Sequence, residues 1–145
     1  FASDAMRNVS LIGRGSRYRI TGHTSHKVRN FDSIDPSFFN DANMQFCLGY
    51  FVDYSDEAAR QFVRQYRALY NCEPGPFAFQ GHDIIVYFTR ALQEYGSRMI
   101  YGIEDYPMDL IQLKFKFGRR GEHSGMFNEA TKDIVYGENL SIESL

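Results

Sequence analysis

Apolar and polar positions follow a clear order between Gln45 and Gly96, and this stretch predicts most of the regular structure in the chain. Residues 45–52 (QFCLGYFV) form a short apolar run rich in aromatic residues, which is typical of a strand buried on both faces. The run ends at Asp53 and Tyr54, and Ser55 then offers a side chain that can cap a helix. The pattern therefore predicts a buried strand followed by a helix.

Between Ser55 and Asn71, apolar residues recur at intervals of three and four, as they do along one face of an amphipathic helix. Acidic residues in its first turn interact favourably with the helix dipole. We expect one face to be buried and the other to carry arginines. The expected buried residues are Phe62, Val63, Tyr66 and Tyr70, and the expected exposed residues are Arg60, Arg64 and Arg67.

The segment Cys72–Pro76 cannot continue that helix, because its two prolines lack an N–H donor and restrict the residue before them. A second helix is expected over about Gly81–Tyr95, with Gly96 ending it in the left-handed conformation. Its expected apolar stripe consists of Ile84, Ile85, Phe88, Ala91, Leu92 and Tyr95.

Strands are expected on both sides of this region. Asn8–Gly13 and Arg98–Tyr101 each read as a short strand, and residues 14–43 read as a loop with one helical turn near Pro36–Asp41. From Leu110 to Phe117 apolar and polar residues alternate, which predicts a strand with one buried face. Its inward residues would be Leu113, Phe115 and Phe117, its outward residues Gln112, Lys114 and Lys116, and its antiparallel partner Asp133–Tyr136.

Composition narrows the class of protein. The 145 residues suit a single domain, and 16 basic against 18 acidic residues give a net charge of −2, which does not favour nucleic acid as a partner. The sequence has no apolar run long enough to span a membrane. Because the chain begins at Phe1 without a methionine or a leader, we expect it to be a piece of a longer protein.

Two cysteines leave an alternative open. Cys47 lies in the expected buried strand and Cys72 in the loop after the first helix. They could form a disulfide in an oxidising compartment, or each could simply fill space as a small apolar side chain.

Candidate chemistry is sparse. Residues 13–19 (GRGSRYR) resemble a phosphate-binding loop, but the dinucleotide fingerprint fails at Tyr18, so a solvated turn is the other interpretation. His23 and His26 have a metal-compatible spacing in poor helix-forming surroundings, and no metal or other cofactor is expected. Asp53 and Asp83 could form a carboxylate pair, although capping explains both positions. Since no nucleophile motif occurs, we do not expect an enzyme.

Several of these positions together resemble a known family. They are Asp53-Tyr54, Arg67 with Tyr70, Pro74 and Pro76, Gly81-His82-Asp83, Ala91-Leu92, and Gly96. In this order they are similar to type I periplasmic binding proteins, and more closely to branched-chain amino acid receptors and their bacterial envelope relatives. The chain departs from the family in two respects. It is less than half as long as family members, and His82 stands where the family usually has tyrosine.

The resemblance implies an α/β fold: a three-layer-type lobe with a mixed sheet and a C-terminal antiparallel hairpin. Residues 1–145 would form a single α/β domain of a longer two-lobed protein. Within it, about 1–52 and 108–145 would form the sheet-forming lobe, and about 53–107 a helical crossing segment.

The resemblance also implies a function: non-enzymatic binding of a small solute such as an amino acid, held in a cleft between lobes for uptake by an ABC permease. The location would be the periplasm or cell envelope of a bacterium. Phe77 or Phe79 would line the cleft, and Asp53 and Tyr54 match a hinge crossing. Two alternatives stay open: an envelope scaffold or regulator that binds a protein or cell-wall component, and an enzyme using the anion loop at 13–19. Because a solute would contact both lobes, the chain alone is expected to show no measurable amino acid binding.

Overall fold

The computed structural model describes residues 2–13, 23–25, 35, 37–41, 44–121, 123–136 and 142–144. The chain forms two compact units, which we call the sheet unit (Phe1–Leu48 with Lys132–Leu145) and the helical unit (Gly49–Thr131). Residues 108–131, which the sequence analysis grouped with the sheet-forming lobe, thus group with the helices. That the chain is part of a longer two-lobed protein stays a prediction.

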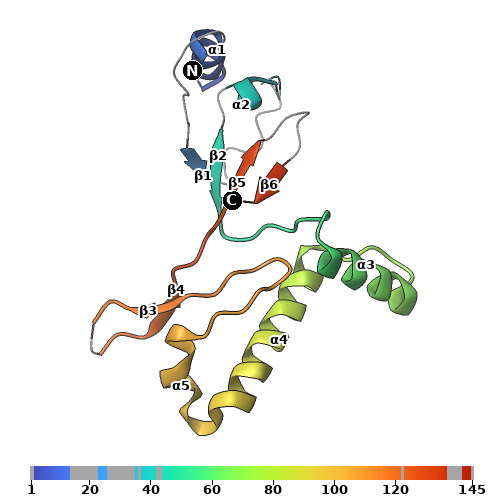
Figure 1. Ribbon diagram of the computed structural model, residues 1–145, viewed down its shortest axis with the longest axis vertical. Coiled ribbons are helices and arrows are strands. Elements are labelled where there is room, and N and C mark those ends of the chain that lie inside the picture. Colours follow the sequence, from blue (N-terminus) through green and yellow to red (C-terminus); the bar gives the residue numbers. More distant parts are fainter. Residues whose placement is uncertain are drawn as a thin grey trace. The chain divides into compact units, whose positions relative to one another are not determined.

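The sheet unit contains a mixed sheet with the strand order β1-β2-β5-β6 (Figure 1). Its strands are β1 (His23–Ser25), β2 (Gln45–Leu48), β5 (Lys132–Tyr136) and β6 (Ile142–Ser144). β1 runs parallel to β2, whereas the pairs β2–β5 and β5–β6 are antiparallel. A mixed sheet that ends in an antiparallel pair agrees with the α/β class expected from the sequence.

Strand β2 is shorter than expected and is buried on one side only. It ends at Leu48, where the chain bends at Gly49, and the residues up to Val52 lie in a loop. Phe46 and Leu48 are buried, but Cys47 between them is exposed and its Sγ lies 2.7 Å from Oδ1 of Asp133. The expectation of a strand buried on both faces was therefore wrong, because the apolar run continues into a loop.

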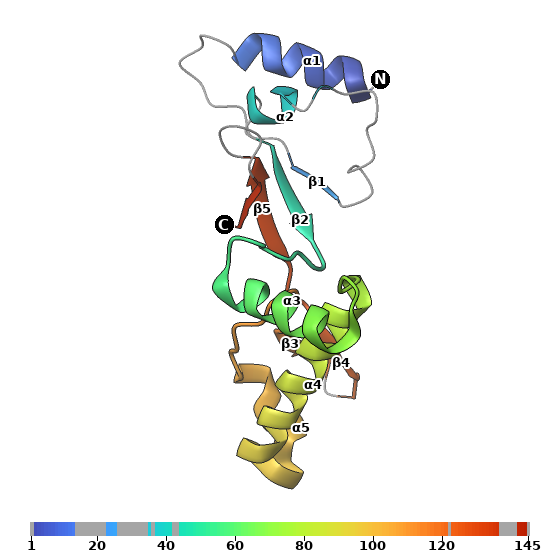
Figure 2. The same cartoon turned by 90° about the vertical axis from the view of Figure 1, so that its right-hand side faces the viewer.

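The first twelve described residues form helix α1 (Ala2–Gly13), not the strand expected at Asn8–Gly13. Ser10 is fully buried there, and its Oγ donates a hydrogen bond of 2.7 Å to Oδ2 of Asp41. Asp41 belongs to the short helix α2 (Ser37–Asp41), which confirms the helical turn predicted near Pro36 and lies beside α1 (Figure 2). A six-residue window was too short to separate a strand from the end of a longer helix.

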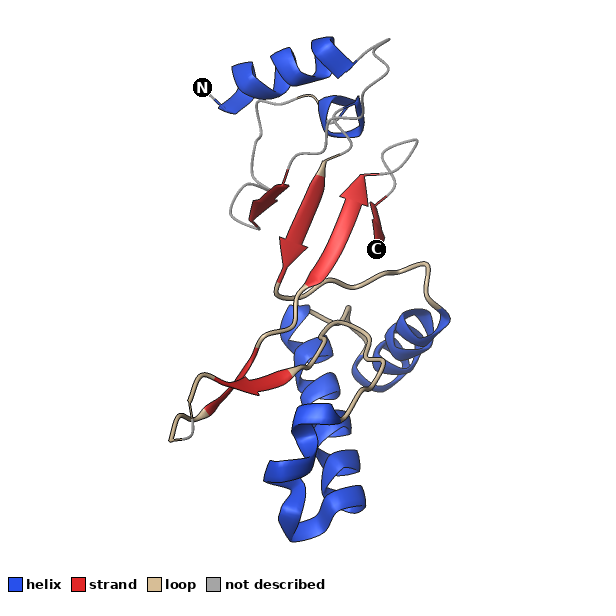
Figure 3. Ribbon diagram, turned by 60° about the vertical axis from the view of Figure 1, so that its left-hand side comes forward, coloured by secondary structure: helices blue, strands red, loops and turns tan. Residues whose placement is uncertain are grey.

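The helical unit contains the long helices and a small hairpin (Figure 3). Its helical elements are α3 (Glu57–Tyr70), α4 (Pro76–Tyr95), η2 (Gly96–Arg98), α5 (Met99–Gly102) and η3 (Ile103–Asp105). The hairpin pairs β3 (Phe117–Arg119) with β4 (Met126–Asn128). Residues 98–101, expected to be a strand, are helical instead.

Helix α3 has the arginine face that the sequence predicted, with different ends. Its N-cap position is Asp56, because the N–H and Oγ of Ser55 both bond to Oδ1 of Asp53, at 2.8 and 2.6 Å. Of the four residues expected to be buried, Val63 is, Phe62 and Tyr66 are half-buried, and Tyr70 is exposed. Placing Tyr70 in the core was wrong, since it lies in the last turn before Asn71.

Helix α4 begins earlier than expected and buries a different face. It starts at Pro76, a residue that suits the first helical position because its missing N–H would have had no partner there. The buried positions are Phe79, Asp83, Tyr87 and Ala91, each four residues from the next. Of the expected stripe, Ala91 is buried, but Ile85 and Leu92 are 68% and 55% exposed, so the prediction holds for Ala91 and was wrong for these two residues.

Gly96 has the positive φ that the sequence predicted, at 55°, although its ψ of −134° lies outside the left-handed helical region.

The alternation at 110–117 describes burial correctly over 113–116, but neither the strand nor its pairing. Residues 110–116 are not part of a strand, and β3 begins only at Phe117. Leu113 is buried and Lys114 and Lys116 are exposed, as predicted. Gln112, predicted to face outward, is buried, and its Nε2 donates to the carbonyl of Pro76 at 3.1 Å. The expected pairing with residues 133–136 was wrong, because those residues lie in β5 between β2 and β6. Alternation indicates which face is buried and carries no information about the partner strand.

Candidate functional site

A hollow of about 350 Å³ lies within the helical unit, between α3, α4 and the segment 109–111. We call it the polar hollow, because its lining includes six polar side chains: Asp56, Gln61, Gln65, His82, Asp83 and Asp109. Apolar residues complete the wall, among them Phe62 and Leu110. Carboxylates, amides and an aromatic ring around one concavity are the elements of a small-molecule site.

Asp83 of α4 forms part of the lining and holds the third wall in place. Its carboxylate is fully buried and accepts backbone N–H groups from Ile111, Gln112 and Leu113 at 3.3, 2.6 and 2.8 Å. Hydrogen bonds to a charged acceptor are stronger than neutral ones, and here they compensate for the carboxylate's loss of hydration. Residues 111–113, which include one end of this wall, are thus held by a side chain of α4.

His82 is held between the carboxylate and the aromatic wall. Its Nδ1 lies 3.0 Å from Oδ1 of Asp83, and its ring centroid lies 4.8 Å from that of Phe62. About a third of the side chain stays exposed. In the sequence, His82 and Asp83 belong to the resembled pattern, with His82 as a departure from it, and Asp83 is a candidate for helix capping or a carboxylate pair; both line the hollow. The available signal was a charged residue midway between Phe79 and Tyr87 at helical spacing.

The four residues predicted to bind ligand lie elsewhere in the helical unit. Phe79 is 1% exposed and packs against Phe62 and Tyr54, with ring centroids 4.9 and 6.1 Å apart. Phe77 is 84% exposed. Asp53 accepts from Ser55 in the turn before α3. The structure thus brings Tyr54 and Phe79 together behind Phe62, and the part of all four residues in binding stays a prediction.

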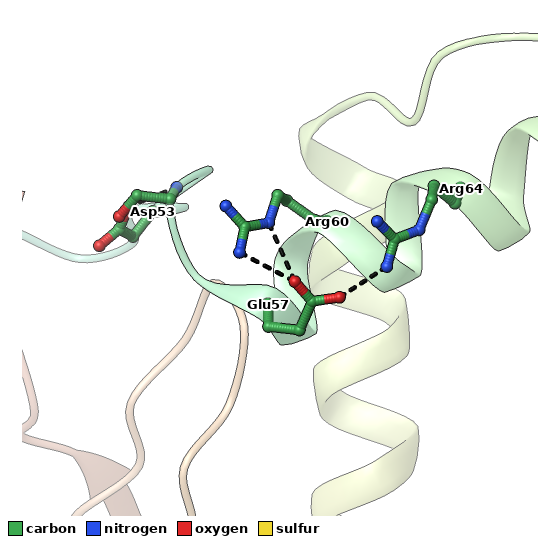
Figure 4. A network of polar contacts seen from close by, with 5 residues as sticks. Asp53, Glu57, Arg60 and Arg64 are labelled. Atoms are coloured by element: carbon green, nitrogen blue, oxygen red, sulfur yellow. Dashed lines mark hydrogen bonds and ion pairs between the residues drawn. The ribbon is translucent and has the colours of Figure 1, made fainter.

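A second hollow, of about 270 Å³, lies on the outer side of α3 and is lined by Tyr54, Arg60, Val63, Arg64 and Arg67. We call it the arginine hollow. Next to it the carboxylate of Glu57 binds two of the guanidinium groups, as Figure 4 shows. Tyr54 therefore lines a concavity, but a different one from the polar hollow.

The remaining candidates do not form a site in the described part of the chain. Gly13 ends helix α1, and the rest of the predicted anion loop, residues 14–19, lies outside the described residues. His23 belongs to strand β1, and His26 lies outside the described residues. Among the residues that are described, no group of histidine, cysteine or acidic side chains could hold a metal ion.

The cysteines and the paired carboxylates can be placed directly. Cys47 and Cys72 are exposed and no disulfide joins them, so neither the bridge nor the buried position considered for them is seen. The carboxylate of Asp53 accepts a hydrogen bond from the N–H of Ser55, whereas that of Asp83 accepts from the N–H groups of residues 111–113. No helix in the described residues has the length and apolar character needed to cross a membrane.

Comparison with known proteins gives little further information. No family model matches the chain, and no curated protein matches it. Among solved structures, it is similar to a protein from Rhodospirillum rubrum described as a candidate branched-chain amino acid ABC transporter, with 17% identity and a TM-score of 0.49. The match covers 99% of this chain and 41% of that one, so the chain spans less than half of that protein's length. At this identity and TM-score the similarity establishes neither a family nor a ligand.

Proposed function

We propose that this chain is part of a non-enzymatic solute-binding protein of the bacterial periplasm or cell envelope. In this proposal it forms one three-layer-type lobe of a type I periplasmic binding protein, which holds a small solute such as an amino acid for uptake by an ABC permease. The residue pattern from Asp53 to Gly96 supports the class of protein. The polar hollow supports the binding of a small molecule.

The charges that line the polar hollow favour the positively charged end of a solute. Its charged groups are the carboxylates of Asp56, Asp83 and Asp109, and the described lining includes no lysine or arginine. Such a wall attracts an ammonium group, while Gln61 and Gln65 can donate or accept hydrogen bonds. In this proposal the hollow contributes the contacts to the amino group, and a second lobe contributes the remaining contacts.

Calorimetric titration with amino acids tests the proposal, using both the 145-residue chain and the complete gene product. We expect binding by the complete product and no measurable heat from the chain at millimolar ligand, because one lobe alone does not offset the loss of translational freedom. Asp109→Asn should weaken binding by about tenfold, since it removes a charge beside the ligand. Asp105→Asn is the matched control, because Asp105 is exposed and not among the lining residues.

Two results would contradict the proposal. Equal affinity of the Asp109→Asn and Asp105→Asn variants would place the ligand outside the polar hollow. Micromolar binding by the 145-residue chain would show that a complete pocket exists within these residues and that no second lobe is needed.

One observation favours the envelope scaffold as a second candidate. Large apolar side chains of α4 and α5 are exposed, namely Ile85, Leu92, Ile100 and Tyr101. An exposed apolar surface of this kind is common where a protein partner binds. Under this alternative, adding an envelope extract should protect the amides of α4 and α5 from hydrogen exchange, and amino acids should leave them unchanged. Protection by amino acids alone would exclude it.

A further inference from the structure

We infer that the arginine hollow on α3 is a binding site for an oxyanion, either a carboxylate or a phosphate group. This site is separate from the polar hollow and does not depend on the function proposed above. Its residues come from α3 and from the turn before it, all within the helical unit.

The helix period brings the arginines together. Arg60, Arg64 and Arg67 follow one another at intervals of four and three, so they lie on one face of α3. The buried side chain of Val63 and the exposed ring of Tyr54, from the turn before the helix, complete the lining. The Tyr54 ring is itself held against Phe79, at 6.1 Å between centroids. The result is a concavity of about 270 Å³ rather than a flat charged surface.

Two glutamates orient the guanidinium groups from outside the hollow. Glu57 accepts from Arg60 at 2.8 and 3.1 Å and from Arg64 at 2.6 Å. Glu73 accepts from Arg67 at 2.7 and 2.9 Å. Both glutamates are exposed and neither is among the residues lining the hollow, whose charged side chains are the three arginines.

Glu57 is ionised near neutral pH. Its hydrogen bonds to Arg64 and then to Arg60, together with their positive charges, lower its pKa from the usual 4.5. Both arginines are therefore held by a full negative charge at pH 7.

The donors left over suit an oxyanion. Each guanidinium carries more N–H groups than its bonds to Glu57 or Glu73 use, and their planar arrangement matches carboxylate and phosphate oxygens. Because the side chains are already oriented, a ligand loses less affinity to ordering them. The Tyr54 hydroxyl can donate a further hydrogen bond.

The test is a titration of the isotope-labelled chain with inorganic phosphate and, separately, with acetate, each followed by backbone amide shifts against sodium chloride of equal ionic strength. We expect saturable shifts at Tyr54 and along 60–67 with at least one of the two anions, and the anion that binds more tightly identifies the class of ligand. Shifts equal to those caused by chloride would overturn the inference.

A matched pair of variants separates a specific site from general charge attraction. Arg64→Gln removes one positive charge from the lining and should weaken binding of that anion by about tenfold. Arg90→Gln removes the same charge from an exposed position of α4 outside the hollow and should leave binding unchanged. Equal affinities of the two variants would overturn the inference. Both side chains are exposed, so each variant should keep its far-ultraviolet circular dichroism and can be compared at the same temperature.

Discussion

At the scale of single residues, the buried carboxylate of Asp83 holds a segment that is distant in the sequence. The pattern of apolar residues does not indicate this role. A buried carboxylate is expensive unless its oxygens are hydrogen-bonded. Here it accepts from backbone N–H groups at 111, 112 and 113, and His82 lies beside it. These bonds provide acceptors for backbone N–H groups in a segment that is not part of a strand. One side chain thus provides the acceptors for three consecutive backbone N–H groups.

Replacing Asp83 should therefore be strongly destabilising. Asp83→Ala leaves buried N–H groups without an acceptor and should lower the free energy of unfolding by about 3–5 kcal/mol in urea denaturation. Asp83→Asn keeps one acceptor oxygen and should lose less. Glu94→Ala, an exposed position on the same helix, serves as the control and should change stability by less than about 0.5 kcal/mol. A loss as small as that of the control would mean that segment 111–113 is held by other contacts.

At the scale of elements, helix α4 shows how an offset of two residues changes the role of an aromatic side chain. Phe77 and Phe79 both lie in the first turn after Pro76, and the sequence could not choose between them as ligand contacts. Phe79 is aligned with Asp83 and Tyr87 on the buried face, whereas Phe77 points to the exposed side. The structure therefore assigns Phe79 to the core and leaves Phe77 available for contact with another molecule.

The two phenylalanines should respond differently to truncation. Phe79→Ala removes a fully buried ring that contacts Phe62 and Tyr54, and should lower the free energy of unfolding by about 3–5 kcal/mol. Phe77→Ala should change it by less than about 0.5 kcal/mol, because its ring is exposed. Chemical denaturation of both variants in the same buffer provides the comparison. Similar losses from the two substitutions would show that α4 buries a different face.

At the scale of the whole molecule, the two units are built from the sequence in different ways. The helical unit is continuous from Gly49 to Thr131, whereas the sheet unit combines the beginning of the chain with its end. In the sheet, β5 lies between β2 and β6 and pairs with β2 from Gln45 opposite Val135 to Leu48 opposite Lys132. Half of the strands of this sheet therefore come from residues after 131.

Removing residues 132–145 should therefore expose strand β2. It would keep only β1 as a neighbour, so hydrogen-exchange protection of its amides should fall by more than about tenfold. Removing only residues 142–145 deletes the edge strand β6 and leaves the β2–β5 pairs intact, so protection of β2 should change little. Unchanged protection of β2 in the longer deletion would contradict the observed strand order.

The sequence by itself determined the features whose causes are local: the helical turn at 37–41, the arginine face of α3, the alternation of burial at 113–116 and the mixed α/β class. Propensity, capping and periodicity act within a few residues, so a single sequence shows them. Only the tertiary structure decided which face of α4 is buried, that 133–136 pairs with β2 and β6, and that His82 and Asp83 line a hollow. Asp83 meets its partners 28 to 30 residues away and Cys47 meets Asp133 at a separation of 86, and a local pattern cannot specify contacts between residues so far apart.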